Sequence, residues 1–261
     1  MHSFFAEDLN FANIGLQNAD VAFYTVTDST NTRAREAFLG SPDGAPKLYV
    51  AEEQTAGRGT RGRSFESREG GLYFSYLFVS KRDCLSSSKL TPLAAAAVWS
   101  ALSSMLGRES SDTLTIKWVN DVFLGGKKIS GILSERIEKD GRVGIIVGIG
   151  INLYGSPFSP EVKKIAASVE ELTGKRLDKL RLLYEILCRL IPAISEEKKN
   201  GLSRIYRKHG LKRGARISVT DSLGKEREAT VIGLDRSYRL RVKYTDGERA
   251  ALISGDVKIS L

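Results

Sequence analysis

Residues 114–153, LTIKWVNDVFLGGKKISGILSERIEKDGRVGIIVGIGINL, carry the clearest structural pattern in the chain. Short runs rich in isoleucine, valine and leucine alternate here with two turn dipeptides, Gly125-Gly126 and Asp140-Gly141. Such dipeptides between short apolar runs are a strong local signal of a β-hairpin. This stretch therefore predicts an antiparallel meander, which decides the fold class.

Upstream of the meander, up to residue 80, the pattern predicts three more strands and one helix. Residues 21–27 form an expected strand, and a helix is expected from about Asn31 because Ser29, Thr30 and Asn31 are side chains that cap free N–H groups. KLYVAEEQ (47–54) and GLYFSYLFV (71–79) are strands rich in β-branched and aromatic residues. They flank the arginine-glycine loop, QTAGRGTRGRSFESREGG at 54–71, so an ordered strand holds this loop at each end.

Helical patterns occupy two further regions. Thr91 and Pro92 are expected to open a long apolar helix, with the proline in the first turn, where its missing N–H is not needed. From Glu161 to His209 the periodicity becomes helical, and apolar residues recur at three- and four-residue spacing. Pro192 should kink or break the helix that contains it.

The tail after residue 210 changes character. Several short strands follow one another there, separated by turn signals around Leu223-Gly224, Asp235-Arg236 and Asp246-Gly247. This pattern suits a small β-barrel. We therefore expect an α+β protein with a larger domain at residues 1–210 and a small barrel domain at residues 211–261.

The composition is that of an ordinary soluble globular protein, with 41% hydrophobic and 27% charged residues. No apolar stretch approaches the roughly 18 residues of a membrane span. The opening MHSFFAEDLNFANIG lacks the basic-then-apolar pattern of a secretion signal, so we expect a cytoplasmic protein without membrane contact. The net charge of +9 and the pI near 9.5 favour anionic partners, whether nucleotides, acidic proteins or nucleic acids.

Histidine and cysteine are scarce. Histidine occurs only at positions 2 and 209, which argues against a histidine-based triad or a histidine metal cluster. Cys84 and Cys188 are far apart in the sequence and have no partners at metal-ligand spacing, so we expect reduced thiols. The chemistry must then depend on lysine, arginine, carboxylates and backbone amides.

Four clusters of candidate binding residues lie at expected strand ends or in loops. They are DSTN (28–31), the arginine-glycine loop, the pair KWVND (117–121) and GKKISGIL (126–133), and VGIGIN (147–152). Each also has a simpler explanation: helix capping, a solvated loop, a solvated strand face and a tightly packed core strand. Taken one at a time, none of them identifies a function.

In this order, and followed by a small β-barrel, the four clusters resemble the biotin protein ligases over nearly the whole chain from about Val21. The resemblance implies a mixed, largely antiparallel sheet with helices, a catalytic domain like that of class II aminoacyl-tRNA synthetases, and a C-terminal Src-homology-3-like β-barrel. It implies an enzyme that activates biotin with ATP and Mg²⁺ as biotinyl-5′-AMP and transfers it to a lysine of a biotin carboxyl carrier domain. Some 20 residues precede the first expected strand, so the monofunctional type without a DNA-binding domain is expected.

The resemblance also assigns roles to residues. Ser29, Thr30 and Gln54, in the cluster that includes Asn31, would hydrogen-bond the ureido ring of biotin. Lys117 would reach phosphate, and Lys128 would lie between the biotin carboxylate and the α-phosphate. Asp121 would orient or deprotonate the acceptor lysine and is a candidate ligand for Mg²⁺. The remaining expected contacts in the loop are Gly57, Arg58, Gly59, Thr60, Arg61 and Arg63. Arg58 is also a candidate catalytic residue, and Arg61 and Arg63 would contact phosphate. Outside the loop, Asn120 would lie near the metal, Gly131, Gly148 and Gly150 beside biotin, and Asn152 at the nucleotide.

Departures from the family pattern matter as well. Thr60 stands where the family often has arginine, Val119 replaces a usual proline, and Phe65 stands near a common tryptophan. Because threonine cannot supply positive charge, we predict that the adenylate is released more readily than in members with the full arginine set.

The sequence leaves two other functions open. A lipoate protein ligase would share the fold and the adenylating logic, but its arginine-then-triple-glycine pattern and motif histidine are absent. A basic nucleic-acid-binding module would use the net charge, but such a tract is usually repetitive and disordered. Exposed strand edges in the meander would also allow a homodimer.

Overall fold

A computed structural model describes residues 16, 19–42, 44–80, 87–155, 158–194, 200–220, 224–253 and 256–259. Its centre is a seven-stranded sheet in the order β1-β2-β3-β7-β6-β5-β4. The strands are β1 (Asp20–Thr27), β2 (Lys47–Gln54), β3 (Gly71–Ser80), β4 (Leu114–Lys117), β5 (Asp121–Leu124), β6 (Lys127–Lys139) and β7 (Arg142–Asn152). Only β1 and β2 pair in parallel, and the other neighbours are antiparallel. The predicted mixed, largely antiparallel sheet and its meander β4 to β7 are therefore confirmed.

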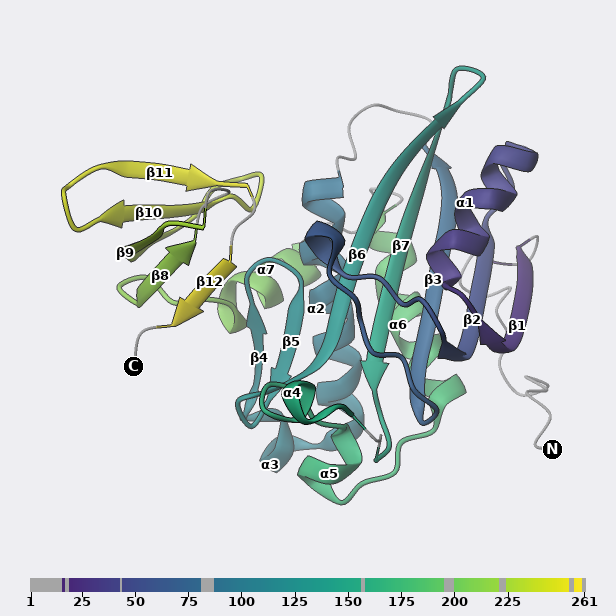
Figure 1. Cartoon of the computed structure of the whole chain (residues 1–261), viewed down its shortest axis with the longest axis horizontal. Helices are drawn as coiled ribbons and strands as arrows, with labels where there is room; N and C mark the ends of the chain where they lie inside the picture. The colour runs from purple at the N-terminus through teal and green to yellow at the C-terminus, as the bar shows by residue number, and fades with distance from the viewer. Residues whose placement is uncertain are drawn as a thin grey trace.

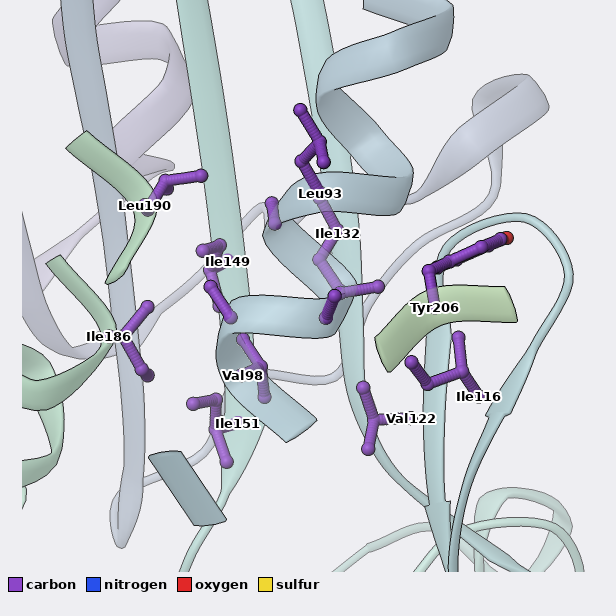
Figure 2. Close-up of a cluster of buried hydrophobic side chains, with 14 of the residues drawn as sticks. Leu93, Val98, Ile116, Val122, Ile132, Ile149, Ile151, Ile186, Leu190 and Tyr206 are labelled. Atoms are coloured by element: carbon purple, nitrogen blue, oxygen red, sulfur yellow. The ribbon is translucent and has the colours of Figure 1, made fainter. Parts of the chain in front are cut away.

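The two faces of the sheet have different neighbours (Figure 1). Helix α2 (Ser87–Leu106) packs on one face with α6 (Lys179–Ile194) and α7 (Asn200–His209), whereas α1 (Thr30–Gly40) and the arginine-glycine loop cross the other face. Figure 2 shows how side chains of α2 and α6, such as Val98, Ile186 and Leu190, meet Ile149 and Ile151 of β7. The functional side chains predicted from the sequence gather on the opposite face, with α1.

The alternation along β7 explains this division. Ile145, Val147, Ile149 and Ile151 belong to the large core under α2. The intervening residues Gly144, Ile146, Gly148 and Gly150 face α1 and the loop, because successive side chains of a strand point to opposite faces. One strand thus serves as core wall and, through its glycines, as a closely approachable surface.

The prediction for Pro92 was wrong, and of the two outcomes predicted for Pro192, a kink or a break, the structure excludes the break. Helix α2 begins at Ser87, so Pro92 lies inside it and not in its first turn; Leu90 is fully buried, and its burial favours the longer helix. Pro192 does not break α6, which continues to Ile194. The buried Ala193 and Ile194 hold this last turn against the core.

The remaining helices are short. The region from residue 161 to 209 contains separate helices rather than one, because Ser168 caps a new helix and Gly174 ends it with a φ of 68°. They are α4 (Pro160–Lys163), α5 (Val169–Thr173), α6 and α7; α3 (Arg108–Ser111) follows α2, and a 3₁₀ turn covers Thr60–Gly62. Among the described residues, no helix is long and apolar enough to cross a membrane.

The tail forms a second antiparallel sheet of five strands in the order β11-β10-β9-β8-β12. Its strands are β8 (Arg216–Thr220), β9 (Glu226–Leu234), β10 (Leu240–Tyr244), β11 (Arg249–Leu252) and β12 (Asp256–Ile259). The predicted short strands are confirmed, whereas closure into a barrel is not shown by these pairings. The predicted turn residue Leu223, Cys84 and the first 15 residues lie outside the described residues.

The two sheets touch through aromatic side chains. The indole Nε1 of Trp118 donates to the carbonyl oxygen of Tyr238 at 2.9 Å, and the Tyr206 ring meets the Tyr238 ring edge-on at 5.5 Å. The Tyr206 hydroxyl also donates to the carbonyl oxygen of Val119 at 3.0 Å. The turn between β4 and β5 is therefore fixed by α7 and by the connection between the second sheet's strands β9 and β10.

Candidate functional site

A pocket with a volume of about 280 Å³ opens on the face of the sheet that carries α1. Its lining combines the start of α1, the arginine-glycine loop, the β4–β5 turn, and glycines of β6 and β7. Every site residue predicted from the sequence lines it except Gly57 and Asn152: Ser29, Thr30, Asn31, Gln54, Arg58, Gly59, Thr60, Arg61, Arg63, Lys117, Asn120, Asp121, Lys128, Gly131, Gly148 and Gly150.

The polar residues at the start of α1 do not serve as helix caps. Ser29 occupies the N-cap position, but its side chain makes no capping bond. Instead, Gln54 Oε1 from β2 accepts a hydrogen bond from the Thr30 backbone N–H at 2.8 Å. Burial opposes ionisation of the neighbouring Asp28, yet bonds from the Ser29 N–H and Arg33 keep the pKa of that carboxyl below its usual value. The simpler explanation by side-chain capping is therefore wrong. The hydroxyl and amide groups at the start of α1 are not used as caps and line the pocket instead.

These groups form a buried network. Ser75 Oγ of β3 lies 2.7 Å from Thr30 Oγ1 and 2.6 Å from Asn31 Oδ1, and Gln54 Nε2 donates to Ser67 Oγ at 2.8 Å. Ser29, Thr30 and Asn31 are each at most 4% exposed. The result is a cluster of uncharged hydrogen-bonding groups at the start of α1, which is held by β2, β3 and the arginine-glycine loop.

Glycines of β6 and β7 form the floor beside this cluster. A Cβ on Gly148 would overlap Asn31 Oδ1, and a Cβ on Gly150 would lie 2.8 Å from the Phe65 ring. Gly131 pairs with Gly150 across the sheet and lies under the same ring, with Lys128 Nζ 3.2 Å from its Cβ position. Larger residues at these positions would push Asn31 and Phe65 away from the sheet.

The loop itself is a small folded hairpin. Gly59 N–H donates to the Arg63 carbonyl oxygen at 2.6 Å, and Phe65 N–H donates to the Gly57 carbonyl oxygen at 2.9 Å. Arg61 and Gly62 turn the chain with positive φ angles of 60° and 73°. Gly57 lies outside the pocket lining, and a Cβ there would overlap the Phe65 carbonyl oxygen.

A charged pair lies at the other end of the pocket. Lys128 Nζ is 2.8 Å from Asp121 Oδ1, an ion pair whose angles are not those of a hydrogen bond, and the two side chains are 25% and 20% exposed. The same ammonium lies 5.6 Å from the centre of the Phe65 ring. Lys117 Nζ similarly lies 5.6 Å from the Phe123 ring, and Asn120 Nδ2 donates to the Ile132 carbonyl oxygen at 3.2 Å.

Several residues of the site escaped prediction. Ile165 and Val257 line the pocket from distant parts of the chain, and no local sequence signal marks them. Ser75 and Glu135 bond the start of α1 from β3 and β6. Ser75 is an isolated polar residue within an apolar strand, whereas Glu135 lies between Ser134 and Arg136 and has no local signal. Asn152, in turn, is 3% exposed, and its Oδ1 has no partner among the described residues.

The pocket thus runs from uncharged donors and acceptors at the start of α1 to lysine and arginine side chains and Asp121. Its position on a mixed sheet with helices defines the class: an α+β domain with a polar, partly charged pocket. The match to protein-family models is more particular, since residues 23–152 match the Biotin/lipoate A/B protein ligase family. The chain belongs to this family.

Relatives agree with this assignment. The bifunctional ligase/repressor BirA of Bacillus subtilis is 36% identical over 170 residues, covering 63% of this chain and 50% of the relative. The biotin–[acetyl-CoA-carboxylase] ligase of Paracoccus denitrificans is 36% identical over 156 residues, covering 58% of this chain and 63% of the relative. The chain therefore spans only about half to two thirds of the length of these curated relatives.

Among solved structures, the biotin protein ligase from Aquifex aeolicus in complex with biotin and ATP superimposes with a TM-score of 0.76 at 27% identity. The superposition covers 92% of this chain and 99% of that one. The similarity thus includes the C-terminal sheet as well as the region matched by the family model.

Proposed function

We propose that this protein is a biotin protein ligase: it activates biotin with ATP and transfers the biotinyl group to a lysine of a biotin carboxyl carrier domain. Family membership and the similarity to a ligase whose structure holds biotin and ATP support this. The observation that carries the proposal is the order of groups along the glycine floor. The uncharged cluster lies over Gly148, and the Lys128–Asp121 pair lies beside Gly131 and Gly150, two residues further along β7.

This spacing suits a ligand with a neutral ring and a carboxylate tail. Two residues of a strand cover about 7 Å, so one extended molecule can contact both ends. Thr30 and Gln54 offer hydroxyl and amide groups to a ureido ring, and Ser29 adds a second hydroxyl. Lys128 offers a cation to the carboxylate.

The first step brings two anions together. The biotin carboxylate oxygen forms a bond to the α-phosphorus of ATP, while the bond from that phosphorus to the pyrophosphate oxygen breaks. Lys128, Lys117 and the arginines of the loop would offset this charge, since fixed cations favour such a transfer in a dry pocket. Lys128 is held in place by Asp121 and by the Phe65 ring, so little reorganisation is required.

The second step needs a neutral amine. The acceptor lysine attacks the biotinyl carbonyl carbon, the bond to the AMP oxygen breaks, and the amine loses its protons. Because a free lysine has a pKa of about 10.4, it must be deprotonated or oriented at the site, and we assign this role to Asp121. Asp121→Asn should slow transfer from preformed adenylate to the acceptor, measured by quenched-flow; an unchanged rate would remove Asp121 from this step.

The residues present fit Mg²⁺ only as a companion of ATP. Among the described residues, no group of three or more His, Cys, Asp or Glu side chains could hold a metal ion, and Asp121 is the one acidic residue in the pocket lining. Mg²⁺ commonly binds through one or two carboxylates together with substrate phosphates. Asp121 would supply one ligand, and the ion would offset phosphate charge when bound.

The decisive experiment combines the protein with biotin, MgATP and a biotin carboxyl carrier domain. We expect one modified lysine by mass spectrometry, and pyrophosphate release that requires biotin. Lipoate in place of biotin is the control, because the matched family includes lipoate ligases. Modification by lipoate alone would reassign the substrate, and no modification with either acid would refute the proposal.

Three finer features belong to the same proposal. The C-terminal sheet would close into a Src-homology-3-like barrel domain at residues 211–261, and the reaction would take place in the cytoplasm, where ATP and carrier domains are available. A homodimer would form through an exposed strand edge of the meander, whose strand β4 ends the central sheet. Light scattering at several concentrations tests the dimer.

A further inference from the structure

Glu135 connects three parts of the site although it does not line the pocket. It lies on β6, and its side chain is 18% exposed. Its Oε1 lies 2.8 Å from Arg35 of α1, and its Oε2 accepts from Asn31 Nδ2 at 2.7 Å and from Arg58 of the loop at 3.2 Å. One carboxylate therefore joins a strand, the start of α1 and the arginine-glycine loop.

The carboxylate also sets the direction of the buried hydrogen bonds. Because it can only accept, the Asn31 amide must turn its NH₂ group toward Glu135 and its oxygen toward Ser75. The single Ser75 hydroxyl proton then goes to Asn31 Oδ1, since an amide oxygen cannot donate. The Thr30 hydroxyl must consequently donate toward Ser75 or Gln54, which leaves an oxygen lone pair to accept from a ligand N–H.

We propose that Glu135 is a positioning residue with two effects. It holds the arginine-glycine loop in place, and it sets which groups donate and which accept in the hydrogen-bonded cluster of Thr30, Asn31 and Ser75. It tethers Arg58, and through Asn31 it keeps Thr30 ready to accept a hydrogen bond. The tether is independent of any substrate, whereas the effect on ligand affinity rests on the proposed function. The two parts therefore need separate measurements.

Glu135→Gln is the direct test. The substitution keeps the size of the side chain but removes its charge, so Arg35 and Arg58 would face one neutral amide. It also introduces an NH₂ group that can face the NH₂ group of Asn31, and two donors cannot form a hydrogen bond with each other. Glu138→Gln is the matched control, because Glu138 lies on the same strand with a 59% exposed side chain and pairs with Arg136.

Limited trypsin digestion without ligand measures the tether. Cleavage after Arg61 and Arg63, followed by mass spectrometry, should be about fivefold faster in Glu135→Gln, a modest effect because the Arg58 side chain is 41% exposed. Glu138→Gln should match the wild type. An unchanged loop cleavage rate in folded Glu135→Gln would overturn the tether.

Arg58→Gln breaks the same contact from the loop side and guards against a folding defect. It should also speed cleavage after Arg61 and Arg63, and the double variant should be cut no faster than Glu135→Gln alone, because both changes remove one interaction. If Glu135→Gln does not fold, an unchanged rate in Arg58→Gln overturns the tether.

Calorimetric titration with biotin, in the absence of ATP, measures the effect on polarity. We expect the Kd for biotin, measured at a temperature where both proteins are folded, to rise about tenfold in Glu135→Gln, as one disturbed charged or buried hydrogen bond would cause. An unchanged Kd would overturn this part. If the wild type does not bind biotin, the proposed function fails while the cleavage rates still decide the tether.

Discussion

Gly148→Ala should destabilise the fold by forcing one buried amide out of place. A Cβ at Gly148 would overlap Asn31 Oδ1 and lie 2.8 Å from Asn31 Cγ. Since carbon atoms reach contact at about 3.5 Å, the amide must move by at least about 0.7 Å. Asn31 is 4% exposed and held by bonds of 2.6 Å and 2.7 Å to Ser75 and Glu135, so no relaxed position is close by.

The cost follows from these contacts. Overpacking a buried site costs about 1–3 kcal/mol, and each strained hydrogen bond of a buried group adds about 1 kcal/mol. We therefore expect the free energy of unfolding to fall by about 3 kcal/mol. Biotin affinity should fall with it, because Thr30 and Asn31 belong to one network.

Urea denaturation followed by circular dichroism measures the loss. Gly40→Ala is the matched control, since Gly40 ends α1 and nothing lies within 4 Å of its Cβ position. In an Asn31→Ala background, where the overlapping amide is absent, Gly148→Ala should cost little. A loss below about 1 kcal/mol, or an equal loss in both backgrounds, would refute this account.

Three further predictions concern single residues. Thr60→Arg should slow adenylate release in single turnover by adding a fixed cation to the pocket lining, and equal release from both proteins would contradict this. Ser130→Ala should raise the free energy of unfolding by about 1 kcal/mol, because Ser130 is fully buried and its hydroxyl has no partner among the described residues; a lower urea midpoint would count against it. Burial against Trp99 lowers the pKa of His209, and the positive charges of Lys208 and Lys212 lower it further, so folding favours the neutral imidazole. The free energy of unfolding should therefore fall as the pH drops below the pKa of the unfolded-state histidine, about 6.5. Urea midpoints between pH 7 and pH 5 should decline less in His209→Gln, and parallel profiles would exclude this group.

The β7 segment shows how far local sequence can be interpreted. VGIGIN suggested either a packed core strand or a surface for close approach, and both are correct. Ile149 and Ile151 face the core, whereas Gly148 and Gly150 face the pocket. Period-two alternation predicts that the strand has two different faces, but it does not say what covers each face. The sequence of the strand alone therefore could not show that one face packs in the core while the other lines a pocket.

Contacts between distant segments were beyond the reach of the sequence. Asn31 and Glu135 are 104 residues apart along the chain, and Trp118 and Tyr238 are 120 apart. Neither pair has a local pattern, because strand order is decided by packing across the sheet. The family pattern brought most site residues together, although Gly57 lies outside the pocket lining, where the Phe65 carbonyl oxygen leaves no room for a side chain.

The Trp118 indole has a consequence for building chimeric enzymes from this chain. It is buried at the β4–β5 turn, between Lys117 and the residues that lead to Asp121, and it bonds the main chain of the second sheet. Val257 of the second sheet lines the same pocket. The tail is therefore not an interchangeable module, and a graft from a relative would need to reproduce this indole acceptor and this apolar contact in order to keep the two lysines of the pocket aligned.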